Sequence, residues 1–263
     1  MISLEDSLAL HATGEGAWRA FSDPENEAGT GMFGGWTAAL LLKAVLSDAR
    51  MQGEPAALNV NYVSRIPPSS ELAITTRVLD QGRSIATWQA EVRVEGAEEV
   101  AATASVVAGN RRDGIGGFVE GAMPAAPDPA TLQVFHPPGP FGQRIDLRPT
   151  EMRMPFNAPT THSLSWLRDM AGHPADHVLL AYLSDCFMPR IFAKSSGFRP
   201  SSTLTMSVYF YATAAELAAV GDDYILSDVI GTRAEAAISG SQLRLWSRAG
   251  ALLATSEQLA WYK

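Results

Sequence analysis

The chain has 263 residues, of which 46% are hydrophobic and 18% are charged, and its formal net charge is −8. This composition predicts a packed core in one large or two small domains, and it argues against disorder and against nucleic acid as a partner. Without a signal peptide or an 18-residue apolar run, neither secretion nor a membrane span is expected. The single cysteine, Cys186, excludes an internal disulfide and indicates a reducing, cytoplasmic setting.

The first half of the chain predicts one helix followed by a run of strands. Apolar residues recur at helical spacing in GGWTAALLLKAVLSDAR, which predicts a helix over 35–50 with glycines at its start. Extended segments are predicted before the helix, and alternating sequences rich in β-branched residues predict four strands after it. The extended segments are 7–13 and 16–23, and the strands are 57–65, 71–80, 85–94 and 99–109.

The second half repeats this order. It predicts a helix over about 176–192, preceded by extended segments at 152–158 and 163–170, and followed by strands at 203–211, 224–234, 240–248 and 251–262. Residues 111–145 are rich in Gly, Pro and Ala and are interpreted as a surface linker. The chain therefore divides into 1–110, the linker 111–145, and 146–263. We expect an α+β fold in which two antiparallel sheets each wrap around a central helix and pair edge to edge, which protects strand edges.

Asp185 lies at an unexpected place in the second helix. In LLAYLSDCFMPRIF it is the only charged residue before Arg190, and apolar residues surround it. An ionised carboxylate in such surroundings costs several kcal/mol unless it is paired, hydrogen-bonded or used in a reaction. The position therefore indicates either a structural role, as a helix cap or an ion-pair partner of Arg190 or Lys194, or a functional role.

Several short segments together resemble the acyl-CoA thioesterase II family. GAWRAFSD, MFGGWTAALLLKAV, DQGRS, YLSDCFMP, STLTMSVYFY and ATSEQ occur in the family's order and spacing. The resemblance implies a double hot-dog fold, an acyl-CoA or related acyl thioester as substrate, and hydrolysis without a metal or cofactor. Carried over by position, the family's catalytic Asp, Thr or Ser, and Gln fall on Asp185, Thr203 and Gln258. Ser202 and Thr205 are alternatives to Thr203.

These three residue types suit hydrolysis by direct attack of water. A thioester carbonyl is already activated, so the enzyme has to aim a water molecule, accept its proton and stabilise the oxyanion. Asp185 can accept the proton, while the amide of Gln258 and the hydroxyl of Thr203 can hold the water. A desolvated carboxylate is a stronger base than a solvated one, which gives a reason for the apolar surroundings of Asp185.

The start of the first helix is the predicted place of substrate contact. Gly34 and Gly35 permit a close approach of backbone, and with Trp36 they are predicted to line the acyl or pantetheine tunnel. The segment lacks the full spacing of a phosphate-binding loop. Little basic character surrounds the predicted site, and the candidates for binding CoA phosphates are Arg111, Arg112, Arg190, Lys194 and Arg199.

Aligning the two halves predicts that only the second is catalytic. The residues of the first half that align with the proposed catalytic set all lack polar side chains: Ala39, Ala57 and Val106. A structural need for the set would have left polar residues in both copies. The first half is therefore expected to be a catalytically empty partner.

Three alternatives and one further expectation accompany this interpretation. The first alternative is that Cys186 acts as a nucleophile. It is disfavoured because no histidine that could activate the thiol lies near it in the sequence. A hot-dog hydratase or dehydratase needs a histidine at the helix, and none occurs there in either half. A non-catalytic acyl-thioester binding protein has no use for a desolvated base. Sheets of this kind also associate readily, so a homo-oligomer is expected.

Overall fold

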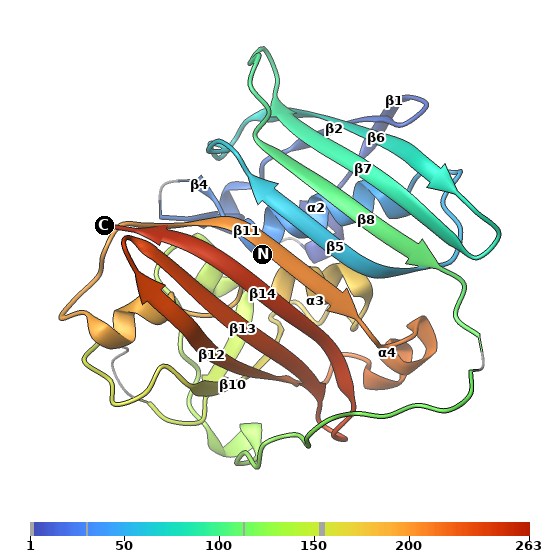
Figure 1. Cartoon of the computed structure of the whole chain (residues 1–263). Helices are drawn as coiled ribbons and strands as arrows, with labels where there is room; N and C mark the ends of the chain where they lie inside the picture. Colours follow the sequence, from blue (N-terminus) through green and yellow to red (C-terminus); the bar gives the residue numbers. More distant parts are fainter. Residues whose placement is uncertain (1–2, 30, 113, 153–155) are drawn as a thin grey trace.

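The computed structural model describes residues 3–29, 31–112, 114–152 and 156–263. Among these residues, twelve strands form one continuous antiparallel sheet in the order β1-β2-β6-β7-β8-β5-β11-β14-β13-β12-β10-β9 (Figure 1). The strands of the first half are β1 His11–Gly14, β2 Ala17–Phe21, β5 Glu54–Tyr62, β6 Glu71–Gln81, β7 Ile85–Val94 and β8 Ala102–Gly109. Those of the second are β9 Ile145–Pro149, β10 Ser163–Asp169, β11 Ser201–Phe210, β12 Ile225–Glu235, β13 Ile238–Ser247 and β14 Leu252–Tyr262. A separate hairpin joins β3 (Glu27–Ala28) to β4 (Gly31–Met32).

The eight strands predicted after the helices all form, within a few residues of their predicted bounds. Burial alternates along them, as in β7, because one face of each strand meets the core and the other meets solvent. The expected pair of sheets is instead one sheet, because β5 and β11 pair antiparallel from Asn61 opposite Thr205 to Ala57 opposite Tyr209. Neither half therefore leaves these strand edges exposed.

Two helices pack against each other on the inner side of this sheet. They are α2 (Gly34–Leu46) and α3 (His177–Leu183), and Figure 1 shows both behind the strands. Residues from both halves form one shared hydrophobic core around them. Two short helices were not predicted: α1 (Leu4–Ser7) and α4 (Ala214–Val220). The start of α4 carries a capping box between Thr213 and Glu216, a signal readable in the sequence.

The prediction of a helix over 176–192 is wrong in its second part. Helix α3 begins after Asp176, whose side chain caps Leu179 N, and it ends at Leu183. Pro189 has no amide hydrogen and cannot continue a helix, and a short 3₁₀ helix (Arg190–Lys194) follows it. The amide of Gln258 donates to the Ser184 carbonyl, which satisfies a group freed at the helix end. Asp185 therefore lies on a loop just past the helix.

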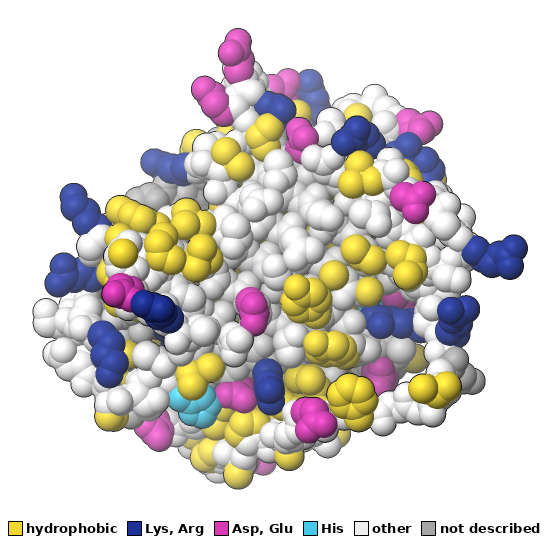
Figure 2. Space-filling model, viewed as in Figure 1, with side chains coloured by type: hydrophobic (Ala, Val, Ile, Leu, Met, Phe, Trp, Pro, Cys, Tyr) yellow, Lys and Arg dark blue, Asp and Glu magenta, His cyan; other side chains and the backbone are white. Residues whose placement is uncertain are grey.

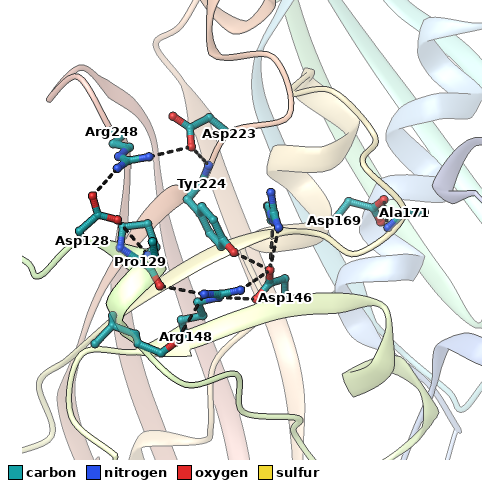
Figure 3. A network of polar contacts seen from close by, with 12 residues as sticks. Asp128, Pro129, Asp146, Arg148, Asp169, Ala171, Asp223, Tyr224 and Arg248 are labelled. Carbon is teal, nitrogen blue, oxygen red and sulfur yellow. Dashed lines mark hydrogen bonds and ion pairs between the residues drawn. The ribbon is translucent and has the colours of Figure 1, made fainter.

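The segment between the halves is held to the second half at several points, and it does not simply wander over the surface (Figure 3). Arg148 pairs with Asp146 and also donates to the Pro129 carbonyl. Arg248 pairs with Asp128, and the Trp166 indole donates to the Pro127 carbonyl at 2.8 Å. The segment includes two short 3₁₀ helices, Pro129–Thr131 and Pro140–Gln143.

The extended segment predicted at 152–158 is not found where it can be compared. Residues 153–155 lie outside the described residues, and 156–158 form no strand. The strand that pairs with β10 is β9, a few residues earlier in the chain. No helix among the described residues is long and apolar enough to cross a membrane.

Candidate active site

A cavity of about 580 Å³ lies where the two halves meet. Its wall includes the start of α2, the loop after α3, and parts of β5, β11 and β14. Four of the predicted site residues line it together: Gly34, Asp185, Thr203 and Gln258. The strands and helices thus bring residues far apart in the sequence to one place.

Asp185 is held in this cavity by two neutral donors. The Gln258 amide donates to Asp185 Oδ1 at 2.6 Å, and the Gly35 backbone amide donates to Oδ2 at 2.9 Å. Burial raises the pKa of Asp185 to about 6, although both hydrogen bonds act in the opposite direction. Among the described residues no Lys or Arg lies within ion-pair distance of it. The alternative ion pair with Arg190 or Lys194 is therefore not formed.

The paired glycines are explained by close contacts. A Cβ at Gly34 would lie 2.6 Å from Asp185 Oδ2, and one at Gly35 would lie 2.3 Å from the Tyr182 carbonyl oxygen. Tyr62 lines the same cavity, and its hydroxyl donates to the Gly34 carbonyl at 2.9 Å. Because the Gly34 carbonyl and the Gly35 amide belong to one peptide group, Tyr62 fixes the group that binds Asp185. Tyr62 is the last residue of β5, and no motif in the sequence predicts that it belongs to the site.

Gln258 uses its amide hydrogens within the protein. Besides Asp185, its Nε2 approaches the Ser184 carbonyl and the Met206 sulfur, each at 3.3 Å. The expectation that this NH₂ holds the water directly is therefore corrected: the NH₂ holds the carboxylate. The Gln258 carbonyl oxygen has no hydrogen-bond partner among the described residues, and it can accept from a water in the cavity.

Strand β11 removes one of the three hydroxyl candidates, Thr205, and leaves Ser202 and Thr203. A bulge between Thr203 and Thr205 shifts the register against β14. Ser202 and Thr203 line the cavity, whereas Thr205 is exposed and is not part of its wall. In the described structure the Thr203 hydroxyl makes no hydrogen bond to Asp185 or Gln258, so its contact with either one would have to pass through a bound molecule.

Two residues singled out in the sequence lie elsewhere. Trp36 is completely buried, its indole donates to Ser7 Oγ at 3.0 Å, and it does not line the cavity. It is a core residue, and the expected substrate contact is absent. Cys186 is buried with its sulfur 3.6 Å from the Tyr182 carbonyl, and burial raises the pKa of its thiol well above the usual value. A protonated buried thiol is a poor nucleophile.

The strand registers correct one detail of the comparison between the halves. Met206 lies opposite Gln258 in the second half, and Val60, which aligns with Met206, lies opposite Ala104 in the first. Gln258 therefore corresponds to Ala104 and not to Val106. Both alternatives are apolar, so the first half still lacks a counterpart to the Gln258 amide.

Both central helices end in the sequence Leu-Ser-Asp, and the two aspartates have opposite surroundings. Asp48, after α2, accepts hydrogen bonds from the Arg50 guanidinium at 2.7 and 2.9 Å and from the Thr76 hydroxyl at 2.8 Å. These bonds, with Arg50 first, lower its pKa to about 2. Asp48 is a structural ion-pair partner, while Asp185 has no cation and a raised pKa.

The cavity is more basic than the sequence indicated. Arg65 and Arg199 are exposed at its edge and have no ion-pair or hydrogen-bond partner among the described residues, and Arg190 forms part of its inner wall. Of the other candidates, Arg111 donates to the carbonyls of Pro55 and Phe210 instead. Arg190 and Arg199 lie nine residues apart in one segment, and the structure adds Arg65 from the first half, which the sequence did not indicate.

Comparisons with known proteins agree with this architecture. Family models for the N-terminal and C-terminal domains of acyl-CoA thioesterases match residues 21–109 and 120–262. A hot-dog protein of unknown function from Alicyclobacillus acidocaldarius is similar in structure, with 30% identity, a TM-score of 0.93, and coverage of 100% of this chain and 98% of that chain. No curated protein matches the chain significantly.

Two more distant structures share the fold. The TesB protein of Mycobacterium avium subspecies paratuberculosis is 19% identical, with a TM-score of 0.82, and an acyl-CoA thioesterase II from Mycobacterium marinum is 19% identical, with a TM-score of 0.78. Each comparison covers 99% of this chain and 98% of the other. The two domain models confirm the resemblance found in the sequence. Since the two domain models together span most of the chain, it belongs to the acyl-CoA thioesterase family and is a thioester hydrolase.

Proposed function

We propose that this protein hydrolyses acyl-CoA thioesters by direct attack of water, with Asp185 as the general base. The observation that carries the proposal is the state of this carboxylate. It lines a cavity, it is held by two neutral donors, and its pKa is raised to about 6. Such a group is ionised at neutral pH and still a strong enough base to accept a proton from water.

The reaction needs one water and no covalent enzyme intermediate. As the water oxygen attacks the thioester carbonyl carbon, Asp185 accepts its proton, and the carbonyl oxygen becomes an oxyanion. The carbon–sulfur bond then breaks, and Asp185 returns the proton to the leaving thiolate. Gln258 and Gly35 keep the carboxylate aimed, and Thr203 and the Gln258 carbonyl oxygen are placed to hold the water.

The start of α2 is the proposed site of the oxyanion. The helix itself cannot satisfy its first amides, and partial positive charge collects there. The Gly35 amide is already used by Asp185, so we assign the oxyanion to the amide of Gly34, which lines the cavity. The exposed Arg65 and Arg199 at the cavity edge are assigned to the phosphates of CoA, because guanidinium groups bind phosphate in a bidentate manner.

The two halves of the chain have different roles in the proposed site. We propose a double hot-dog, with residues 1–110 and 146–263 as the two units and 111–145 as the linker. The first unit is catalytically empty in the sense that it supplies no base. It still contributes the Gly34–Gly35 peptide group and Tyr62, so the site depends on both units.

Release of free thiol from a panel of acyl-CoAs tests the proposal. Asp185→Asn should lower kcat by about 10²–10⁴, the usual worth of a positioned base. Asp48→Asn is the matched control: it removes a carboxylate from the same Leu-Ser-Asp context, and it should lower the melting temperature by about 2–6 °C while leaving turnover of the folded protein nearly unchanged.

The remaining residues of the set are tested by combination. Gln258→Ala and Thr203→Ala should each lower kcat, and either one combined with Asp185→Asn should cost much less than the product of the single effects, because all act on one water. Tight binding of acyl-CoAs without any thiol release would point to a binding protein. Full independence of the substitutions would contradict a shared site.

A further inference from the structure

A second cavity, of about 360 Å³, adjoins the first. The loop that follows Asp185 separates them, and six residues contribute to both walls: Pro137, Phe141, Phe187, Met188, Pro189 and Arg190. Apolar side chains such as Leu147 and Val229 line the second cavity, together with several hydroxyl groups and the ionisable residues Glu151 and His162. Five of the six shared residues are apolar. Arg190 is the only charged group in the dividing wall.

Every contact of the Arg190 guanidinium is with a neutral acceptor. Its Nε donates to the Met188 carbonyl at 2.8 Å, and its Nη2 donates to the same oxygen at 2.5 Å. Its Nη1 donates to Ser163 Oγ at 2.7 Å and to the Thr161 carbonyl at 3.2 Å. A guanidinium has five N–H groups, so one on Nη2 has no partner among the described residues. The plane lies over the Phe187 ring, 5.4 Å from its centre.

This positive charge has no counter-ion within the described part of the chain. No carboxylate among the described residues lies within ion-pair distance of Arg190. Glu151, which lines the second cavity, forms no ion pair with it, and Asp228 on β12 is paired with His162 at 2.7 Å. Burial alone lowers the pKa of Arg190 to about 10, and the group remains charged at neutral pH. A buried charge without a partner is costly, and an anion that binds beside it recovers part of that cost.

We propose that Arg190 recognises an anionic group on the acyl chain, so that the preferred substrates are acyl thioesters with a carboxylate at the end away from the sulfur. This inference rests on the proposed thioester hydrolysis, because it places the reacting carbonyl at Asp185. Arg190 lies five residues further along the same loop and lines the same cavity. Its open Nη2 N–H is available to the carboxylate.

The CoA phosphates are a less suitable counter-ion for this residue. A large, multiply charged phosphate group binds best where solvent still reaches it, and Arg65 and Arg199 are exposed at the cavity edge. Arg190 is instead only partly exposed and lies in the mostly apolar wall that the two cavities share. A carboxylate at the end of a short acyl chain is a small, singly charged anion that belongs to the substrate itself, and the cavity that holds the thioester at Asp185 also includes Arg190.

The test compares thioesters in pairs of equal carbon number, one ending in a carboxylate and the other in a methyl group, from three to eight carbons. In the unaltered protein, kcat/KM for at least one carboxylate-ended member should exceed that of its methyl-ended partner by about 10- to 100-fold, the value of one hydrogen bond to a charged group. Arg190→Met should bring this ratio to one or below. Arg190→Lys, which keeps the charge without the planar fork, should give an intermediate ratio.

Arg199→Met is the matched control. It should weaken both members of each pair by the same factor, because both carry the same CoA. The result is judged from the ratio of kcat/KM values within each pair and not from the absolute rates, because Arg190 also holds the loop that carries Asp185 and its replacement can slow both members. If Arg190→Met does not fold, the inference is tested by the kcat/KM ratios of the unaltered protein and of Arg190→Lys.

The result that overturns the inference is a ratio at or below one for every chain length in the unaltered protein, or a ratio that Arg190→Met leaves intact. Binding of the same pairs to Asp185→Asn, measured by calorimetry, gives the ratio of dissociation constants without turnover. A carboxylate preference in binding with no hydrolysis of any thioester would refute the proposed function and support the role of Arg190.

Discussion

Asp185 and Asp48 show how surroundings fix the role of a residue. Both follow the sequence Leu-Ser at the end of a central helix, yet Asp48 meets Arg50 and Asp185 meets only the amides of Gly35 and Gln258. Strong hydrogen bonds and a cation lower one pKa to about 2, and burial raises the other to about 6. A carboxylate pushed toward neutral pH is the one suited to moving a proton.

The first prediction concerns the pH dependence of activity. Because the base must be ionised, kcat/KM should fall about tenfold per pH unit below the Asp185 pKa of about 6. Tyr62→Phe removes the hydrogen bond to the Gly34 carbonyl, which weakens the Gly35 amide as a donor to Asp185. The midpoint should therefore move upward by a few tenths of a unit. Tyr209→Phe, an exposed tyrosine on the outer face of β11, should leave the midpoint unchanged. An unchanged midpoint in Tyr62→Phe would contradict its role.

The second prediction concerns the pH dependence of stability. The Asp185 pKa is raised on folding, from about 3.8 to about 6, so its protonated form stabilises the folded state at low pH. That contribution, up to about 3 kcal/mol, is lost as pH rises from 4 to 7. Asp185→Asn removes the dependence but turns its NH₂ toward one of the two donors, which costs about 1–3 kcal/mol at every pH.

Urea unfolding at several pH values checks this second prediction. The free energy of unfolding of Asp185→Asn, relative to the unaltered protein, should increase between pH 4 and pH 7. A difference that stays constant over this range would mean that Asp185 is not desolvated. For Asp48→Asn the difference should instead stay constant from pH 4 to pH 7 and become smaller as pH falls from 4 toward 2, because the lowered pKa of Asp48 gives stability that is fully present above pH 4 and is lost below it.

At the scale of elements, the sequence predicted the strands better than the helices. In segments such as 85–94 the side chains alternate in polarity, which predicts the alternating burial of a strand. The predicted bounds of this segment are those of β7. The end of α3 depended on Pro189 and on a carbonyl contact from Gln258, which belongs to a strand far along the chain. The resemblance named Asp185 and Gln258. Tyr62 was not predicted from the sequence, and Arg190 was predicted only as a partner of Asp185 or of CoA phosphates, because the contacts of both residues depend on separate elements that meet at one cavity.

The third prediction concerns the start of α2. Gly34→Ala places a methyl group 2.6 Å from Asp185 Oδ2, so the carboxylate has to move. The helix itself accepts alanine readily, and the protein should still fold. We expect kcat to fall about 10²-fold or more, because small displacements of a catalytic group are costly. Gly114→Ala, a position with open space around it, is the control and should have normal activity. Normal activity in Gly34→Ala would mean that Asp185 does not take part in the reaction.

At the scale of the whole molecule, the outer face of the joined sheet differs from the rest of the surface. Figure 2 shows a largely uncharged centre on this face, with most Lys and Arg side chains toward the outline. Polar uncharged residues such as Asn59, Asn61 and Ser207 lie there on β5 and β11. Depletion of charge is typical of interfaces between subunits. A homo-oligomer remains a prediction, and light scattering should give a mass above the 28.1 kDa of one chain.

The last prediction is that the linker can be cut without loss of the site. The halves are joined by the β5–β11 pairing, by the packing of α2 on α3, and by a buried hydrogen bond from the Tyr182 hydroxyl to Asn26 at 2.8 Å. By contrast, Gly116 and Gly117 are exposed with no neighbouring atoms that a side chain would meet. A specific protease site inserted between them should be cut readily.

After cleavage, the two fragments should elute as one particle and keep thioesterase activity within about twofold of the uncut protein that carries the same insertion. Covalent connection then no longer keeps the fragments at high effective concentration, so the melting temperature of the cut protein should fall on dilution while that of the uncut protein stays constant. Fragments that separate under native conditions would mean that the linker holds the halves together. If the C-terminal fragment alone were active, the contributions of Gly34, Gly35 and Tyr62 to the site would be refuted, because they belong to the other fragment.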